Sequence, residues 1–249
     1  MVFLLSSKVE EEFPSIKASP TEIPATLVTI LGEKPPLNLK KIKLPKKYFE
    51  CEQVVLILID NWGLFECTYF GGLGAGKQLI KLLDIFVLFE TKNPYAKLMT
   101  DDIFHGGLPE GAFNMIDFLR SRGLSGIAIG RKGDLDAYCG RAEAVYVKND
   151  SEAYTEIVKR LNKFDFISVQ FSDFDELYEE YKLAPPEEVL KKLITRTSTW
   201  IKLFHDQVKT KTIFCIVGNH GKKELKIGFK GVAAKWKKAN APIAIFMKK

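Results

Sequence analysis

Side chains that could hold a metal ion or a phosphate group follow three hydrophobic segments that lie far apart in the sequence. They are Asp60 after the first segment, Asp175 and Glu179 after the second, and Asn219 and His220 after the third. Carboxylate and amide oxygens are the ligands that hard divalent cations prefer, and imidazole is a common zinc ligand. If these side chains meet, the chemistry that they predict is that of a metal or phosphate site.

The hydrophobic segments themselves indicate how these side chains could meet. Residues 54–59 form a continuous apolar run rich in β-branched side chains, which is typical of a strand buried on both faces of a parallel sheet. Open parallel sheets bind their ligands outside the carboxyl ends of the strands. We therefore expect Asp60, Asp175 and Asn219 at one edge of a shared sheet.

The rest of the chain alternates between strand and helix patterns, which predicts a three-layer α/β sandwich with a mostly parallel central sheet. Further strands are expected near residues 85–89, 125–130, 143–147, 165–171, 212–217 and 242–247, and helices near 22–31, 75–84, 111–122, 151–162 and 186–206. We expect residues 1–249 to form a single domain, with 1–36 as a helical segment packed on the core, 37–53 as a connector and 54–249 as the main sheet and helices.

Composition limits the classes of partner. Lysine and arginine number 37 against 31 acidic residues, and the lysines are spread along the whole sequence. This predicts a solvated surface that attracts small anions weakly, and no nucleic-acid partner. Without an apolar stretch of signal-peptide or membrane-span length, we expect a cytoplasmic protein with no membrane partner. The four cysteines are widely separated, which indicates reduced thiols. The excess of lysine over arginine favours a heat-adapted source. The oligomeric state stays open.

A glycine-rich segment at residues 71–77 offers an alternative. It is similar to a phosphate-cradling loop, because its glycines would let backbone N–H groups approach a phosphate and Lys77 follows them. Gln78 stands where such a loop needs a magnesium-binding Ser or Thr, and the strand that ends in Asp60 precedes the loop. We interpret the segment as a turn before a helix, with a nucleotide triphosphatase as the lesser alternative.

The acidic side chains also have structural explanations. Asp60 could simply cap the turn that continues through Asn61 and Gly63. The carboxylates from Asp173 to Glu180 could be the solvated start of a helix, where acidic side chains complement the positive helix end.

Three segments together resemble the alkaline phosphatase superfamily, which includes cofactor-independent phosphoglycerate mutases, nucleotide pyrophosphatases and arylsulfatases. Residues 54–63 resemble its opening strand with a metal-binding Asp, residues 171–175 a later Asp-bearing segment, and residues 216–221 its Asp-His-Gly signature. Asn219 stands where the signature has Asp. Residues 21–36 resemble a helix that the superfamily carries near its C-terminus, which suggests a circular permutation.

The resemblance implies roles for named residues. Thr91 would be the nucleophile, with Asn93 as the other candidate for that position, and Asn93 and Lys230 would contact the substrate. Asp60, Asn219 and His220 would hold one divalent ion, and Asp175 and Glu179 would contribute to a second, the ions being zinc, manganese or magnesium. Glu179 and Lys230 both stand where the superfamily has histidines.

Two functions follow from the resemblance. The first is a metal-dependent phosphate- or sulfate-ester hydrolase or phosphotransferase that acts on a small phosphorylated or sulfated molecule. The alternative is a catalytically inactive member that binds a ligand or a protein, as the substituted ligand positions suggest.

Overall fold

The computed structural model describes residues 15–36, 38–90, 96–109, 111–181, 185–219 and 242–249. Its strands are β1 (Ser15–Ala18), β2 (Gln53–Asp60), β3 (Ile85–Phe89), β4 (Gly126–Gly130), β5 (Glu143–Tyr146), β6 (Phe166–Phe171), β7 (Thr212–Asn219) and β8 (Ile243–Lys248). Its helices are α2 (Ile23–Ile30), α3 (Leu64–Gly72), α4 (Lys77–Leu82), α5 (Ala96–His105), α6 (Met115–Ser121), α7 (Lys132–Leu135), α8 (Asp150–Arg160), α9 (Asp173–Glu180) and α10 (Glu187–Gln207), with short 3₁₀ turns η1 (Pro20–Glu22) and η2 (Lys46–Tyr48).

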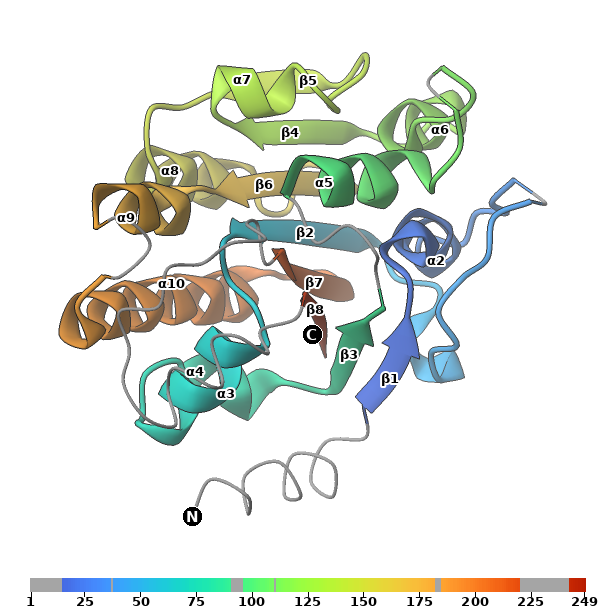
Figure 1. Ribbon diagram of the computed structural model, residues 1–249. Coiled ribbons are helices and arrows are strands. Elements are labelled where there is room, and N and C mark those ends of the chain that lie inside the picture. Colours follow the sequence, from blue (N-terminus) through green and yellow to red (C-terminus); the bar gives the residue numbers. More distant parts are fainter. Residues whose placement is uncertain (1–14, 37, 91–95, 110, 182–184, 220–241) are drawn as a thin grey trace.

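The strands form one eight-stranded sheet in the order β1-β3-β8-β7-β2-β6-β4-β5. Strand β8 runs antiparallel to both of its neighbours, and the other pairings are parallel. Helices cover both faces of this sheet (Figure 1). The predicted α/β sandwich with a mostly parallel central sheet is confirmed.

Alternation along the central strands divides the core in two. Val55, Ile57 and Ile59 of β2 face one cluster, which receives side chains from α3, α4, α8, α9 and α10. Val54, Leu56 and Leu58 face the other cluster, which receives side chains from α2, α5, α6 and α7. Because both faces are apolar, β2 and most of β7 read in the sequence as continuous hydrophobic runs.

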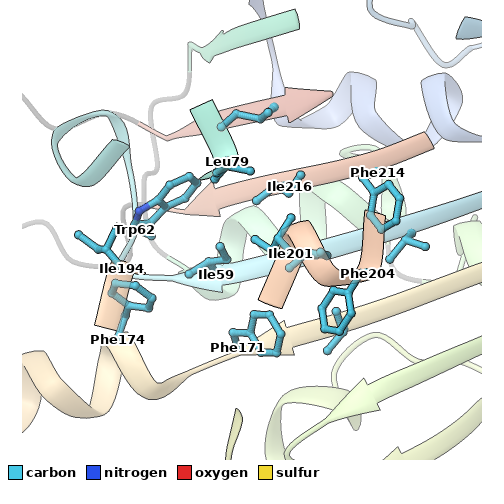
Figure 2. Packing of buried hydrophobic residues seen from close by; sticks show 14 of the residues in the cluster. Ile59, Trp62, Leu79, Phe171, Phe174, Ile194, Ile201, Phe204, Phe214 and Ile216 are labelled. Carbon is cyan, nitrogen blue, oxygen red and sulfur yellow. The ribbon is translucent and has the colours of Figure 1, made fainter. Parts of the chain in front are cut away.

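Aromatic and branched aliphatic side chains fill the cluster that Val55, Ile57 and Ile59 face. Figure 2 shows Ile201 and Phe204 of α10 among Ile59, Phe171 and Ile216 from the strands. All five are buried. This packing fixes the carboxyl ends of β2, β6 and β7 against a helix of 21 residues.

The glycine-rich segment is a turn between helices. It follows α3 instead of a strand, and α4 after it has six residues. Gly74 and Gly76 have φ angles of 88° and 75°, which glycine adopts without steric cost. The interpretation as a turn is confirmed, and the strand, loop and helix that a nucleotide-binding loop requires are not found here.

The N-terminal elements pack on the sheet. Strand β1 pairs with β3, and Ile23 and Leu27 of α2 lie in the same cluster as Ala244 and Phe246 of β8. This proximity is what the circular permutation requires, and the permutation itself stays a prediction. None of the helices within the described ranges is both long and apolar enough to cross a membrane.

Gly218 in β7 allows a close approach of the chain that follows β2. A Cβ atom on Gly218 would lie 2.4 Å from the backbone oxygen of Trp62 and 2.7 Å from its ring. We predict that Gly218→Ala lowers the free energy of unfolding by about 1–3 kcal/mol, because buried backbone must shift to make room. Chemical denaturation measures this change.

Gly133→Ala is the matched control, since a Cβ atom there meets nothing within 4 Å. This control should change the free energy of unfolding by at most about 1 kcal/mol, in the stabilising direction. Equal effects of the two substitutions would contradict the close approach at Gly218.

Candidate functional site

Parallel register brings polar side chains to the carboxyl edge of the sheet. Strand β2 lies between β6 and β7, with Ile59 opposite Phe171 and Asp60 opposite Asn219. The side chains of Asp60 and Asn219 therefore lie next to each other on the same face of the sheet. Both residues are buried.

Asp60 accepts hydrogen bonds from three neutral donors. Asn219 Nδ2 donates to its Oδ1 at 2.8 Å, while Gln170 Nε2 and Ser172 Oγ donate to its Oδ2 at 2.7 Å and 3.0 Å. These bonds satisfy the carboxyl group without any neighbouring cation. They also show that the polar positions of β6 and β7 converge on this one carboxyl.

Asn61 connects the second acidic side chain to this arrangement. Its φ of 51° lies in the left-handed region, which Asn tolerates better than most residues. In this conformation its backbone N–H donates to Asn219 Oδ1 at 3.1 Å, and its Nδ2 donates to Asp175 Oδ1. The turn after β2 thus links β7 to the first turn of α9.

These residues open into a cleft of about 330 Å³. It is lined by Asp60, Thr100, Gly133, Asp134, Ala137, Gln170 and Asp175, which come from β2, α5, α7 and the turn after it, β6 and α9. Three of these are carboxylates, and no lysine or arginine is among the described residues that line it. An anion entering this cleft would meet negative charge.

Burial raises the pKa of Asp60 to about 6. The three hydrogen bonds lower this pKa, and the charge of the nearby Asp134 raises it. Burial also raises the pKa of Asp134, and the charge of Asp175 acts in the same direction. Each carboxyl is therefore harder to ionise than an isolated one. A cation in the cleft would reverse this effect, because opposite charge favours the ionised form.

A separate ionic network fixes the start of α9. Asp150 Oδ1 accepts the backbone N–H of Ser172 at 2.8 Å, and Asp173 Oδ2 accepts from Arg196 Nη2 at 2.8 Å. Arg131 pairs with both Asp173 and Glu176. These contacts hold Ser172 and Asp175 in place, so Asp173 and Glu176 have structural roles, Asp173 within an ionic network and not as a solvated side chain.

The predicted site residues divide into three groups. Asp60, Asn219 and Asp175 come together as expected. Glu179 is exposed on α9 and does not line the cleft. Thr91, Asn93, His220 and Lys230 lie outside the described residues.

Sequence reasoning missed Thr100, Asp134 and Gln170, which line the cleft, and Ser172, which donates to Asp60. Gln170 and Ser172 carried a signal, since a polar residue interrupts the apolar run of β6 and a hydroxyl follows it two positions later on the same face. Thr100 and Asp134 lie on helices, and their local sequence gives no sign of the cleft.

The described donors do not by themselves form a metal site. In the part of the chain that the structure covers, no three His, Cys, Asp or Glu side chains are grouped closely enough to hold an ion between them. Asn219 presents its NH₂ group to Asp60, and its oxygen already accepts from Asn61. The carboxylates fit a hard cation chemically, but a complete site needs ligands from outside the described residues.

The buried carboxyl predicts a pH-dependent stability. Since the pKa of Asp60 is about 6 in the folded chain against an ordinary value of 3.8, the native state binds this proton more tightly than the unfolded chain does. We predict that the stability of the wild type relative to Asp60→Asn falls by up to about 3 kcal/mol as the pH rises from about 4 to about 7. Denaturation curves across this range measure it, and a constant difference would contradict it.

Known proteins are similar to this chain in structure. The sequence matches no family model, and no curated protein is significantly similar to it. A protein of the alkaline phosphatase superfamily from Vibrio parahaemolyticus aligns with a TM-score of 0.53 at 13% identity, over 80% of this chain and 60% of that one. The chain thus spans less than two thirds of that protein.

Two further solved structures are similar to this chain to the same degree. The C-terminal periplasmic domain of EcEptC from Escherichia coli, in complex with Zn, has a TM-score of 0.52 at 10% identity, over 80% of this chain and 73% of that one. Streptococcus pyogenes phosphoglycerol transferase GacH, in complex with sn-glycerol-1-phosphate, has a TM-score of 0.52 at 12% identity, over 79% and 68%. The chain therefore has the α/β fold of the alkaline phosphatase superfamily.

Proposed function

We propose that the cleft at Asp60 binds a small phosphorylated or sulfated molecule together with a divalent cation, and that the chain hydrolyses or transfers the ester group. The observation that carries this proposal is the convergence of β2, β6 and β7 on the buried carboxyl of Asp60, beside a cleft with two further aspartates. Asn219 donates a hydrogen bond to Asp60, and it immediately precedes His220 in the sequence.

The charge of the cleft supports the need for a cation. Asp60, Asp134 and Asp175 would repel a phosphate dianion when ionised, because they carry charge of the same sign. Asp60 and His220 would hold the ion, with Asp175 as a predicted ligand of a second. When bound, such an ion neutralises the charge on the transferred group and lowers the pKa of an attacking hydroxyl.

Thr91 is the predicted nucleophile. Its hydroxyl oxygen would form a bond to phosphorus while the bond from phosphorus to the ester oxygen breaks, and the leaving alcohol takes up a proton. Attack by water on the phosphothreonine, or by an acceptor alcohol, then regenerates the hydroxyl. Asn93 and Lys230 would contact the substrate, Lys230 as a point charge on the phosphate.

Two similar structures support this choice of ligand. One neighbour was solved with Zn and another with sn-glycerol-1-phosphate, and both share the fold over about four fifths of this chain. A small phosphate ester and a divalent cation are accordingly the first ligands to test.

A second candidate function is ligand or protein binding without catalysis. The specific observation in its favour is Asn219, whose NH₂ group donates to Asp60 where the resembling superfamily has a carboxylate. The exposed position of Glu179 points the same way. Metal analysis of the purified protein, combined with turnover of an aryl phosphate, separates the two functions.

Asn219→Asp should strengthen cation binding. The substitution places a second carboxylate against Asp60, so we predict a less stable protein without metal and divalent-ion affinity raised on the order of 10-fold or more. The measurement is the rise in melting temperature on adding Mn²⁺.

Asn149→Asp is the control, because Asn149 caps α8 and Asp caps a helix equally well. It adds the same charge away from the cleft and should leave the Mn²⁺ response unchanged. An equal response in both variants would contradict a cation site at Asp60.

Thr91→Ala should reduce turnover of an aryl phosphate on the order of 10³-fold or more, whereas Thr91→Ser should retain measurable activity because it keeps the hydroxyl. Thr100→Ala is the matched control, since Thr100 is the described threonine that lines the cleft. Loss of turnover in Thr100→Ala with full activity in Thr91→Ala would overturn the assignment of Thr91.

A further inference from the structure

The amino edge of the sheet carries a lysine face. It consists of Lys40, Lys41, Lys43, Lys46, Lys47, Lys209, Lys211, Lys248 and Lys249. Eight of these side chains are exposed, and Lys248 is partly buried. The sequence places them in three separate segments, which is why they look scattered when the chain is read linearly.

Backbone contacts gather the three segments. Lys248 Nζ donates to the carbonyl of Lys47, and Lys211 Nζ donates to the carbonyl of Glu50 at 2.9 Å. Lys249 N donates to Thr212 O at 2.9 Å. The segment that joins α2 to β2 lies at the end of β2 away from α9 (Figure 1). The lysines therefore belong to one end of the molecule.

Buried neighbours direct several of these lysines outward. Ile42 and Leu44 are buried, and the N–H of Ile42 donates to Thr26 Oγ1 at 2.8 Å. Lys41 and Lys43 alternate with them and consequently point to solvent. The exposure of these charges is thus a consequence of how the segment is anchored on α2.

Positive charge dominates this face. Glu50, Glu52, Asp84 and Asp206 lie among the nine lysines. Within the described ranges, none of the nine forms an ion pair with a carboxylate. Their charge is available to an external partner.

The lysine face and the acidic cleft act independently. They lie at opposite ends of β2, whose eight residues span roughly 25 Å. This separation exceeds the Debye length of about 8 Å at physiological salt, so the aspartates of the cleft do not cancel the attraction of the lysines. The molecule presents a cationic end and an anionic end.

We propose that the lysine face docks the protein on an anionic lipid bilayer. Clusters of four to eight basic residues are typical of segments that bind anionic headgroups, and lysine ammonium groups need no fixed geometry for this contact. Single-stranded nucleic-acid sites add arginines and exposed stacking aromatics. All nine residues here are lysine, and the two aromatic rings of this face, Tyr48 and Phe49, are buried and half-buried under Lys47 and Lys41.

Docking through this face would orient the molecule. The lysines approach the negative surface, whereas the reverse orientation would bring Asp60, Asp134 and Asp175 against it and be disfavoured by repulsion between like charges. The cleft would then open away from the bilayer, toward molecules in solution. This inference is independent of the proposed catalytic activity, because it uses none of the cleft residues.

The test is co-sedimentation of the full chain with vesicles. Phosphatidylcholine vesicles that contain an equal part of phosphatidylserine are compared with pure phosphatidylcholine vesicles. We expect binding to the anionic vesicles alone, and release when salt is raised from about 0.1 M to about 1 M, since the Debye length then falls from about 10 Å to about 3 Å. Absence of binding at low salt would overturn the proposal.

Two charge-matched variants localise the effect. The first replaces Lys40, Lys43, Lys46 and Lys209 with Gln, and the control replaces Lys77, Lys132, Lys148 and Lys192 with Gln, all eight being exposed. A lysine near an anionic surface strengthens binding about fivefold, so the first variant should bind on the order of 100-fold or more weakly. The control should bind like the wild type.

Two results would contradict the assignment. Equal losses in the two variants would mean that net charge, and not this face, governs binding. Tighter binding to a single-stranded oligonucleotide than to anionic vesicles at the same salt would assign the face to nucleic acid instead. Thermal unfolding of both variants shows whether they are folded, and salt release of the wild type tests the proposal without any substitution.

Discussion

The parallel register of β2 with β6 and β7 is the constraint on which the site depends. It places Asp60 opposite Asn219 and brings Gln170 and Ser172 to the same carboxyl. A slip of one residue would turn these side chains to the other face, because successive side chains of a strand alternate. Such a slip would also exchange the side chains that β2 contributes to the two apolar clusters, so close packing on both faces opposes it. Core packing and site geometry are thus set by the same alternation.

A buried carboxyl beside two other carboxyls has energetic consequences. Neutral donors satisfy Asp60, but its charge has no cationic partner among the described residues of the cleft. By contrast, Asp173 of α9 is paired with Arg131 and Arg196 and serves the fold. Within the acidic segment, Asp173 thus serves the fold, whereas Asp175 lines the cleft beside Asp60.

The sequence predicted the central features of the fold because its strongest signals are long and periodic. The runs that became β2, β6 and β7 and the pattern of α10 were predicted close to their observed bounds. The short edge strand β1 and the helices α3, α5 and α7 were not predicted. Helix α7 has four residues, and β1 has four, so neither offers enough residues to show a period.

The site was predictable where ligands follow strands directly, as for Asp60 and Asn219. Asp134 and Thr100 reach the cleft through helix packing, which no local pattern encodes. Glu179 was placed by its four-residue spacing from Asp175, yet one helical turn carries it to the exposed surface. The lysine face likewise arises from three distant segments that only the fold brings together.

Calorimetric titration of sn-glycerol-1-phosphate, with and without Mn²⁺, tests the central claim most directly. If the cleft at Asp60 binds an anion through a cation, the phosphate ester should bind in the presence of Mn²⁺, fail to bind in its absence, and fail to bind Asp60→Ala under either condition. Equal binding with and without the metal, or binding unaffected by Asp60→Ala, would contradict the account.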